Sequence, residues 1–473
     1  MRSHRRRLAV AALTAAWVLG CAACEQRRTA PGANVLLIVV DTLRADHLGC
    51  YGYAKPTSPR LDALALRATR FDGARATSSW TLPSVASLLT GLYPAVHGAE
   101  RSDSVLPDGL GTLATDLDAA GYETAAFSAN PAFVTPRQGL AHGFERFDVL
   151  RGAEAEKGTP GAVPADASFR SWVLEANAET VTSAALDWLG ARNEASRPFL
   201  LYLHYFDPHA AYTPPEEYAR RFGVEPGERL AGEEQWRHLL ADEAPDADVM
   251  KVLVSLYDAE IAATDAAVGR LLDGLPAPLR ESTIVVVTSD HGEEFGDHGG
   301  VQHGRTLHDE LLRVPLLIAG PQIPAGKVVT TPVSLAGLRA TLADLLAVRL
   351  PADSGAEASF EPAMRREPDA PAPVFADLEK RFEADRQLHR RAMVEGNWKL
   401  LVDPARSASL FDVATDPGEK NAVLAEAART ERMLADVFDR DVKAVSRRAL
   451  APPRRVILDP AKREQLKALG YLQ

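Results

Sequence analysis

The segment 34-NVLLIVV-40 decides the fold of this chain. A continuous apolar run, rich in β-branched side chains, is typical of a strand that is buried on both faces of a sheet. Runs of the same kind recur at 199-FLLYLHYF-206, 283-TIVVVTS-289 and 314-VPLLIA-319. Stretches with helical character lie between these runs, over residues 59–68, 113–120, 179–191 and 252–272. The alternation predicts an α/β fold, with a mostly parallel central sheet between layers of helices.

Composition divides the chain into a main domain and a smaller C-terminal part. Over residues 351–373 the sequence becomes rich in Ala, Pro, Glu and Asp, which is typical of a linker or a surface excursion. We therefore predict a main domain over residues 33–350 and a C-terminal subdomain over residues 374–473. Short strand-like pieces followed by a helical stretch, residues 422–442, predict a small α+β arrangement for this subdomain.

The overall charge argues against one class of partner. The chain has 473 residues and a formal net charge of −11, and its basic residues are mostly dispersed along the sequence. A polyanion would be repelled by such a protein, so we expect no nucleic-acid partner.

The first residues resemble an export signal. An arginine-rich start precedes a short apolar run, residues 8–20, which is too short to be a comfortable membrane-spanning helix. Cys21 follows this run as the lipid-bearing cysteine of a bacterial lipoprotein would, and Cys24 is the second candidate. We expect residues 1–24 to be a signal peptide with a lipobox and residues 25–32 to be a tether; an ordinary secretory signal is the alternative. The protein would then be exported and lipid-anchored in the cell envelope, in the periplasm or at the cell surface.

Acidic and histidine side chains follow the ends of three buried runs. The first run is followed by Asp41, the second by Asp207 and His209, and the third by Asp290 and His291. In an open α/β sheet, ligands bind outside the carboxyl ends of the strands, where these side chains would meet. The pattern predicts a shared metal site at this edge of the sheet, although any single aspartate could be a helix cap.

A hydroxyl side chain stands at the start of a predicted helix. In 81-TLPS-84, Pro83 suits the first turn of a helix that continues to residue 90. Thr81 would stand just before the helix N-terminus, where free N–H groups and the helix dipole favour an anion. A threonine at this place can be a simple cap, but beside a metal site it can serve as a nucleophile.

Together these motifs resemble those of the sulfatase family, within the alkaline-phosphatase superfamily. The resemblance rests on 41-DTLRAD-46 with 48-LGCYGY-53, 81-TLPS-84 with 90-TGLYP-94, 204-HYFDPH-209, 289-SDHGE-293 with 296-GDHG-299, and 410-LFD-412 with 416-DPGE-419. It extends from residue 34 almost to the end of the chain. It implies an alkaline-phosphatase-like fold and activity as an ester hydrolase.

The resemblance also implies roles for individual residues. Asp41, Asp290 and His291 would bind one divalent cation together with Thr81, and His209 would contact the oxygens of the transferred group. A histidine ligand fits zinc or manganese better than calcium, which prefers oxygen donors. We therefore favour zinc or manganese, with calcium as the alternative.

Four positions depart from the family pattern. Sulfatases oxidise a cysteine or serine of the signature to formylglycine, but Thr81 stands at this position and does not undergo this modification. Val85 replaces the signature arginine, Thr42 replaces the second acid of an aspartate pair, and His303 stands where a lysine often occurs. The remaining set resembles instead the single-metal site of phosphoethanolamine and glycerol-phosphate transferases of the superfamily, in which a threonine attacks phosphorus.

The sequence allows two roles for each of several side chains. Asp207, His209 and His303 could hold a second metal ion, but we favour His209 and His303 as direct substrate contacts. A protonated His303 would also assist the leaving group. Arg44 could bind the substrate or pair with a buried acid.

The sequence therefore predicts a metal-dependent hydrolase or transferase that cleaves phosphate, phosphonate or sulfate esters with Thr81 as the nucleophile. The substrate would be a small molecule or a glycan or lipid ester. The alternatives are a sulfuric ester hydrolase that does not use formylglycine and a non-catalytic lipoprotein that binds an anionic glycan. A lipid-linked transferase is a further alternative, although such enzymes usually carry several membrane helices.

Overall fold

The computed structural model describes residues 29–151, 176–193, 196–226, 232–239, 245–366, 372–381, 387–403, 407–423, 426–448 and 454–455. The predicted signal peptide and both candidate lipid-bearing cysteines lie outside these residues. Within the described part, none of the helices combines the length and the apolar character that crossing a bilayer requires.

A central sheet of eight strands forms the core of the main domain. The strands lie in the order β12 (Lys327–Val329), β2 (Ala68–Phe71), β11 (Leu316–Ala319), β8 (Thr283–Ser289), β1 (Asn34–Val40), β7 (Phe199–Tyr205), β5 (Glu123–Ser128) and β6 (Arg146–Val149). All neighbouring strands pair in parallel except at β11, which runs antiparallel to both β8 and β2. The sheet is therefore mostly parallel, as predicted.

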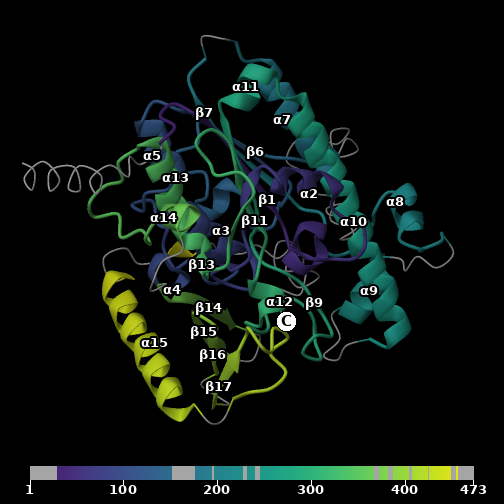
Figure 1. Cartoon of the computed structure of the whole chain (residues 1–473), viewed down its shortest axis with the longest axis vertical. Helices are drawn as coiled ribbons and strands as arrows, with labels where there is room; N and C mark the ends of the chain where they lie inside the picture. The colour runs from purple at the N-terminus through teal and green to yellow at the C-terminus, as the bar shows by residue number, and fades with distance from the viewer. Residues whose placement is uncertain are drawn as a thin grey trace, which may run out of the picture.

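Helices cover both faces of this sheet (Figure 1). On one side lie α2 (Pro59–Ala65), α7 (Ala178–Gly190) and α10 (Ala247–Gly274), and α10 contacts both of the others. On the other side lie α3 (Thr81–Thr90), α5 (Leu113–Ala119) and α13 (Leu338–Leu346), and α3 contacts both of the others. The predicted α/β architecture, a sheet between two helix layers, is confirmed.

Shorter elements connect these layers. They are the helices α4 (Pro94–His97), α8 (Glu216–Arg221), α9 (Gly232–Leu239), α11 (Ala277–Glu281) and α12 (Asp309–Leu312), the 3-10 turns η1 (Ala45–His47), η2 (Gly49–Tyr51), η3 (Pro136–Gln138) and η5 (Leu335–Gly337), and the strand pairs β3 (Ala74–Arg75) with β13 (Val333–Ser334), β4 (Ser104–Val105) with β18 (Arg454–Arg455), and β9 (Glu294–Phe295) with β10 (Val301–Gln302).

Strand register decides which side chains meet at the edge of the sheet. Every residue of β1, β7 and β8 is buried, as the apolar runs predict. β1 lies between the other two, and its last residue, Val40, is paired with Tyr205 of β7 and Ser289 of β8. Because the three strands are parallel and end together, the residues that follow them emerge at one place.

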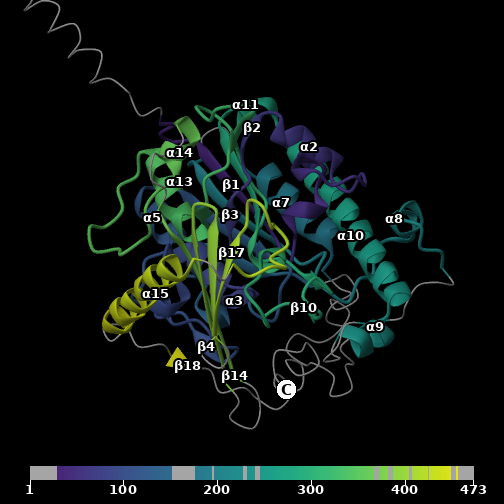
Figure 2. The ribbon, with the colours of Figure 1, turned by 60° about the horizontal axis from the view of Figure 1, so that its bottom comes forward.

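A second, smaller sheet forms the C-terminal subdomain, at the bottom of Figure 1 and toward the viewer in Figure 2. It is an antiparallel meander of β14 (Val374–Arg381), β15 (Gln387–Glu395), β16 (Trp398–Asp403) and β17 (Ser407–Asp412), against which α15 (Ala427–Arg448) packs. Met393, Leu400 and Leu410 of the sheet form a separate apolar core with Met433 and Val437 of α15. The predicted α+β subdomain is present.

The segment predicted as a linker or surface excursion takes part in the main core where it is described. It contains α14 (Glu361–Arg365), in which Met364 is fully buried. The ring of Phe360 packs edge-on against Phe71 of β2, with their centroids 5.1 Å apart. These apolar residues stand singly among Ala, Pro and charged residues, so no periodic pattern marks them as core.

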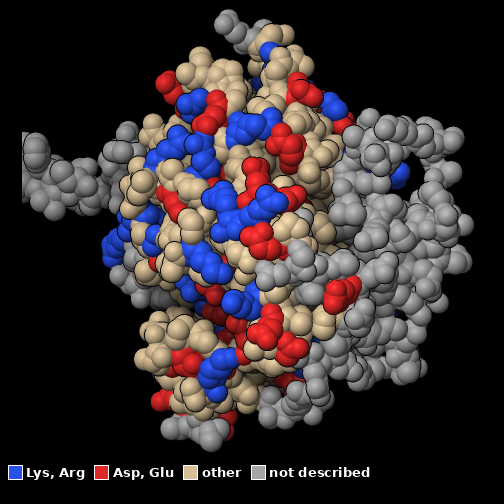
Figure 3. Space-filling model, turned by 90° about the vertical axis from the view of Figure 1, so that its right-hand side faces the viewer, with Lys and Arg blue, Asp and Glu red and all other residues tan. Residues whose placement is uncertain are grey.

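Charges of both signs are mixed on the surface. Figure 3 shows the right-hand side of Figure 1, where lysine and arginine side chains lie among aspartates and glutamates in the described part. Exposed ion pairs, such as Arg60 with Asp273 and Arg270 with Glu179, occur on the surface of the described part. On this face, neighbouring charges largely offset one another, which weakens any long-range field of one sign.

A buried ion-pair network joins the subdomain to the main domain. Lys399 of β16 is fully buried, and its Nζ lies 2.7 Å from Oδ1 of Asp309 and 2.8 Å from Oε1 of Glu419. Asp309, the first residue of α12, also pairs with Arg75 at 2.7 Å. Because buried charges require partners, the network holds only when both parts of the molecule are in place.

Replacing Lys399 by methionine is expected to lower the free energy of unfolding by about 3–5 kcal/mol, because buried carboxylates would lose their compensating charge. Lys443→Met is the control: its pair with Asp439 is exposed on α15 and contributes only about 0.3–0.5 kcal/mol. Denaturant titration of both variants measures the difference. Equal losses in the two variants would show that the network does not stabilise the fold.

The same network makes stability depend on pH. Burial alone would raise the pKa of Asp309, but the charges of Arg75 and Lys399 outweigh burial and lower it. A carboxyl group with a lowered pKa stabilises the folded state above its unfolded pKa, about 4, and this stabilisation is lost as pH falls further. The free energy of unfolding should therefore decrease below about pH 4, and less steeply in Lys399→Met.

Candidate functional site

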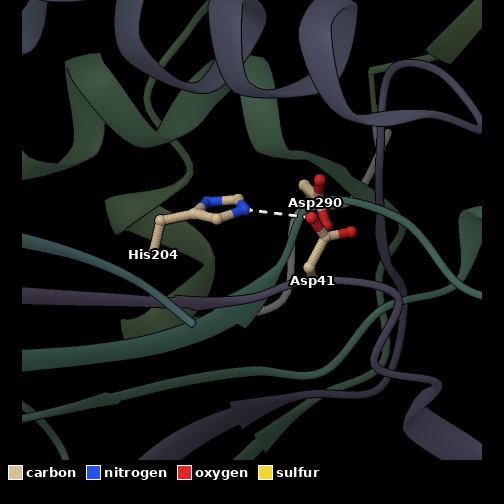
Figure 4. Close-up of side chains that lie close together, drawn as sticks. All are labelled: Asp41, His204 and Asp290. Atoms are coloured by element: carbon tan, nitrogen blue, oxygen red, sulfur yellow. Dashed lines mark hydrogen bonds and ion pairs between the residues drawn. The ribbon is translucent and has the colours of Figure 1, made fainter. Parts of the chain in front are cut away.

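Three buried side chains meet at the carboxyl edge of the central sheet (Figure 4). Asp41 follows β1, Asp290 follows β8, and His204 is the next-to-last residue of β7. One ligand atom of each lies within 4.8 Å of the others, and all three residues have no solvent exposure. This group can hold a metal ion. The sequence predicted Asp41 and Asp290 here, whereas His204 was not predicted as a site residue.

Two carboxylate oxygens of this group have no hydrogen-bond partner among the described residues. They are Oδ1 of Asp41 and Oδ2 of Asp290, and Oγ1 of the neighbouring Thr42 is also without a partner. Thr42 has a φ of 56°, which is strained for a β-branched residue, and its N–H points to Oδ1 of Asp290 at 3.4 Å. Because buried polar atoms are nearly always paired, the free carboxylate oxygens fit a cation.

His291 presents a lone pair to the same place. Its Nδ1 lies 2.9 Å from the carbonyl oxygen of Gly292, which can only accept, so Nδ1 carries a proton. In the neutral ring Nε2 is then free of hydrogen, and burial favours the neutral ring by lowering the pKa of His291. Nε2 lies 3.5 Å from Oδ1 of Asp41 and 3.6 Å from Oδ2 of Asp290.

The two buried carboxyl groups oppose each other electrostatically. Burial and the negative charge of Asp41 raise the pKa of Asp290 well above its usual range. Burial acts in the same direction on Asp41, but its hydrogen bond to His204 and the nearby histidines outweigh burial and lower its pKa. A divalent cation between Asp41 and Asp290 would offset the repulsion between their two negative charges. The kinds of donor atom and the charge of the two carboxylates therefore both fit a metal ion.

Thr81 is the first residue of α3, rather than the residue just before it. Its side chain is fully buried and does not cap the helix, and Oγ1 lies 3.3 Å from Nε2 of His291. The N-cap is Trp80, in an extended conformation, and Pro83 occupies the first turn as predicted. The hydroxyl therefore stands at a helix N-terminus and beside the candidate metal ligands.

His209 and His303 line the same place. Their ring centroids lie 5.0 Å apart, and the ring of His303 is 4.5 Å from that of His291. Nδ1 of His209 donates to the carbonyl of Ala210 at 2.7 Å, and Nδ1 of His303 lies 2.9 Å from Oε1 of Glu293. Burial and the neighbouring His303 lower the pKa of His209 to about 4. Glu293 is a further residue that sequence reasoning gave no role.

Arg44 lies at the sheet edge but is engaged elsewhere. Its guanidinium pairs with Asp46 at 2.7 Å and Asp297 at 2.8 Å, and it donates to the carbonyl of Glu293. Of its two predicted roles, pairing with acids is the one that these contacts support.

Asp207 holds the start of a helix and is not directed to the candidate metal site. Its Oδ2 accepts the N–H of Ala178 at 2.7 Å, so it holds the first residue of α7. Burial raises the pKa of Asp207 to about 6. Asp207 is absent from the group of potential metal ligands found in the described part of the chain.

Comparison with known proteins extends these observations. A family model described as Sulfatase matches residues 33–348, which include every site residue named above. The uncharacterized sulfatase YidJ of Escherichia coli strain K12 is 26% identical over 425 residues, covering 83% of this chain and 83% of YidJ. The choline-sulfatase of Rhizobium meliloti is 28% identical over 438 residues, covering 82% of this chain and 81% of that protein.

A solved structure shares the fold. The phosphonate monoester hydrolase of Agrobacterium radiobacter superposes with a TM-score of 0.67 and 23% sequence identity, covering 91% of this chain and 98% of that one. At this identity the likeness concerns the fold alone.

Proposed function

The chain belongs to the sulfatase family and is an ester hydrolase, and from this premise we propose that it cleaves phosphate, phosphonate or sulfate esters with Thr81 as the nucleophile. The observation that carries this proposal is the place of the Thr81 hydroxyl. It lies 3.3 Å from Nε2 of His291 and does not cap its helix, so it is available for chemistry. The same helix end offers N–H groups to an oxyanion.

The donor set supports one divalent cation. Oδ1 of Asp41, Oδ2 of Asp290, Nε2 of His291 and Oγ1 of Thr81 would hold it. When bound, the cation supplies Lewis-acid activation of the hydroxyl and stabilises charge on the transferred group. A histidine donor favours zinc or manganese, with calcium as the alternative. A second metal is disfavoured because Asp207 is engaged with Ala178.

Thr81 and the side chains around it have separate roles in the transfer reaction. The Thr81 hydroxyl loses its proton to solvent, and Oγ1 then forms the bond to phosphorus or sulfur in line with the bond to the leaving oxygen, which breaks. The N-terminus of α3 contacts the other oxygens of the transferred group, and so does His209 when its Nε2 also carries a proton, because its Nδ1 is engaged with Ala210. His303 delivers a proton to the leaving oxygen, with Glu293 fixing the orientation of its ring. Water, or an acceptor alcohol, then releases the group from Thr81.

Phosphorus chemistry is favoured over sulfur chemistry. A threonine cannot give the formylglycine on which typical sulfatases depend, and Val85 removes the arginine that accompanies it. A threonine alkoxide attacking phosphorus needs neither. The named sulfatase relatives support the competing assignment, a sulfuric ester hydrolase that does not use formylglycine.

We further propose that the protein is exported and held at the cell envelope by a lipid on Cys21 or Cys24. Its substrate would be a small molecule or a glycan or lipid ester that reaches the enzyme outside the cytoplasm.

A turnover panel on the mature protein tests the proposed function. p-Nitrophenyl phosphate, a phosphodiester, a phosphonate and a sulfate are each assayed with zinc, manganese or calcium supplied. We expect turnover of phosphorus esters to exceed turnover of the sulfate. A clear preference for the sulfate would favour the sulfuric ester hydrolase, and no turnover with any metal would favour a binding protein.

His303→Asn is expected to reduce kcat/KM by about 10²–10⁴-fold for esters with a poor leaving group, and far less for activated aryl esters. The physical reason is that only a basic leaving oxygen needs a proton in the transition state. His142→Asn is the control, because His142 pairs with Asp108 at a partly exposed site. An equal loss for all leaving groups would contradict the acid role of His303.

A further inference from the structure

The two carboxylate oxygens of Asp41 have different surroundings. Oδ2 accepts a hydrogen bond from Nδ2 of Asn130 at 2.8 Å and lies 3.1 Å from Nε2 of His204. Oδ1 has no hydrogen-bond partner among the described residues and faces Nε2 of His291 at 3.5 Å. One oxygen is thus held by the protein, and the other is left for a cation.

Strand pairing places both donors at Oδ2. His204 of β7 is the register partner of Val39 in β1 on one side and of Ser128 in β5 on the other. Asp41 and Asn130 each stand two residues beyond these partners, so the three side chains emerge together. The N–H of Ala129 donates to the carbonyl of His204 at 2.9 Å and fixes the turn that carries Asn130.

The amide of Asn130 has a single orientation that satisfies its neighbours. Its Oδ1 accepts the N–H groups of Ala132 at 3.1 Å and Phe133 at 3.0 Å. The amide nitrogen is therefore turned to Asp41, and Asn130 is 1% exposed. An asparagine held from both ends restricts the rotation of the carboxylate that it contacts.

His204 is held by Tyr202, two residues before it on the same face of β7. The Tyr202 hydroxyl lies 3.0 Å from Nδ1 of His204, and both residues are fully buried. A carboxylate oxygen can only accept, so the contact with Asp41 requires a hydrogen on Nε2 of His204. With a hydrogen on Nε2 alone, Nδ1 accepts from the Tyr202 hydroxyl. His291 has the opposite arrangement, with its proton on Nδ1.

We infer that Tyr202, His204 and Asn130 form a clamp that holds Oδ2 of Asp41 and aims Oδ1 at the cation, so that His204 is a positioning residue and not a ligand. His204 lies close enough to Asp41 and Asp290 to be a ligand (Figure 4), but its Nε2 is engaged with Asp41. The inference rests on the metal site of the proposed function. Partners of this kind typically change metal affinity by about 10–100-fold.

The test is a Co²⁺ titration of the metal-free protein, followed by calorimetry and by the visible spectrum of the bound ion. His204→Gln, His204→Ala, Asn130→Ala and Tyr202→Phe are compared with the unchanged protein. Tyr205→Phe is the matched control, since this buried tyrosine of the same strand bonds to Thr182 instead, at 2.8 Å.

We expect His204→Ala and Asn130→Ala each to weaken Co²⁺ binding by about 10–100-fold. His204→Gln should weaken it less than His204→Ala, because a glutamine amide can still donate to Asp41. Tyr202→Phe should cause a smaller loss, and the control none. The positions of the Co²⁺ absorption bands should stay the same in every variant, because no ligand is removed.

Two results would overturn the clamp. Altered band positions in both His204 variants, with unaltered bands in Asn130→Ala, would make His204 a ligand. Unchanged affinity in His204→Ala and Asn130→Ala would show that neither residue positions Asp41. If a His204 variant does not fold, Asn130→Ala and Tyr202→Phe still decide the matter. Failure of the unchanged protein to bind any cation would remove the metal site itself, whereas binding without ester turnover would contradict only the proposed reaction.

Discussion

Thr81→Ala is expected to reduce kcat/KM by at least about 10⁴-fold, because a nucleophile and the groups that activate it act as one unit. Little stability should be lost, since the Thr81 side chain makes no cap to α3. Thr112→Ala is the matched control. Thr112 caps α5 because its side chain accepts a hydrogen bond from the N–H of Thr115. Removing this cap should lower the free energy of unfolding by about 1 kcal/mol and leave turnover unchanged.

The covalent step gives a second readout for Thr81. Acid quenching during turnover of a phosphorus ester should trap a phosphoryl group on the peptide that contains Thr81, detectable by mass spectrometry. Thr81→Ser should retain measurable turnover and the trapped group, because the hydroxyl remains. Undiminished turnover in Thr81→Ala, or a trapped group on another residue, would show that Thr81 is not the nucleophile.

Asp290→Asn is expected to abolish metal-dependent turnover and to weaken cation binding by more than the clamp variants do. The substitution removes a negative charge and one of the two free carboxylate oxygens at the site. An asparagine oxygen can still accept the N–H groups of Thr42 and His291 that Oδ1 accepts now, so the fold should persist. Atomic-emission analysis of bound metal and a turnover assay measure the two effects.

Metal-free Asp290→Asn should also be more resistant to heat than the metal-free unchanged protein. The reason is that Asp41 and Asp290 oppose each other's charge when no cation lies between them. Asp207→Asn is the control, because Asp207 also follows a buried strand but holds the start of α7. It should lose stability and keep its metal. Loss of metal from Asp207→Asn alone would restore the alternative of a second metal at Asp207.

The sequence predicted the central strands of the sheet well and its margins poorly. β1, β7 and β8 are buried on both faces, so their apolar runs are continuous and their ends were predicted to within a residue. β5 and β6 were not predicted, because β5 reads ETAAFS and the half-buried β6 reads RFDV. Neither contains a long run of large apolar residues.

The candidate site shows the same limit. Acids that follow buried strands could be identified from the sequence, but the direction of each side chain could not, and Asp207 proved to bond to α7. His204 and Asn130 acquire their importance from the register of three strands, which no short motif encodes. A histidine inside an otherwise apolar strand was the available signal for His204.

The place where the described chain begins has a consequence for encounters with substrate. The N–H of Ala30 bonds to the carbonyl of Leu345 near the end of α13, beside the edge at which β1 starts, whereas Thr81 and Asp41 lie at the opposite edge. The seven residues of β1 separate the two edges by about 20 Å. If a lipid on Cys21 or Cys24 holds the protein to a bilayer, the chain enters the described fold at the edge opposite the candidate site. The attachment would then leave the site uncovered, and esters that diffuse through the surrounding fluid would reach it.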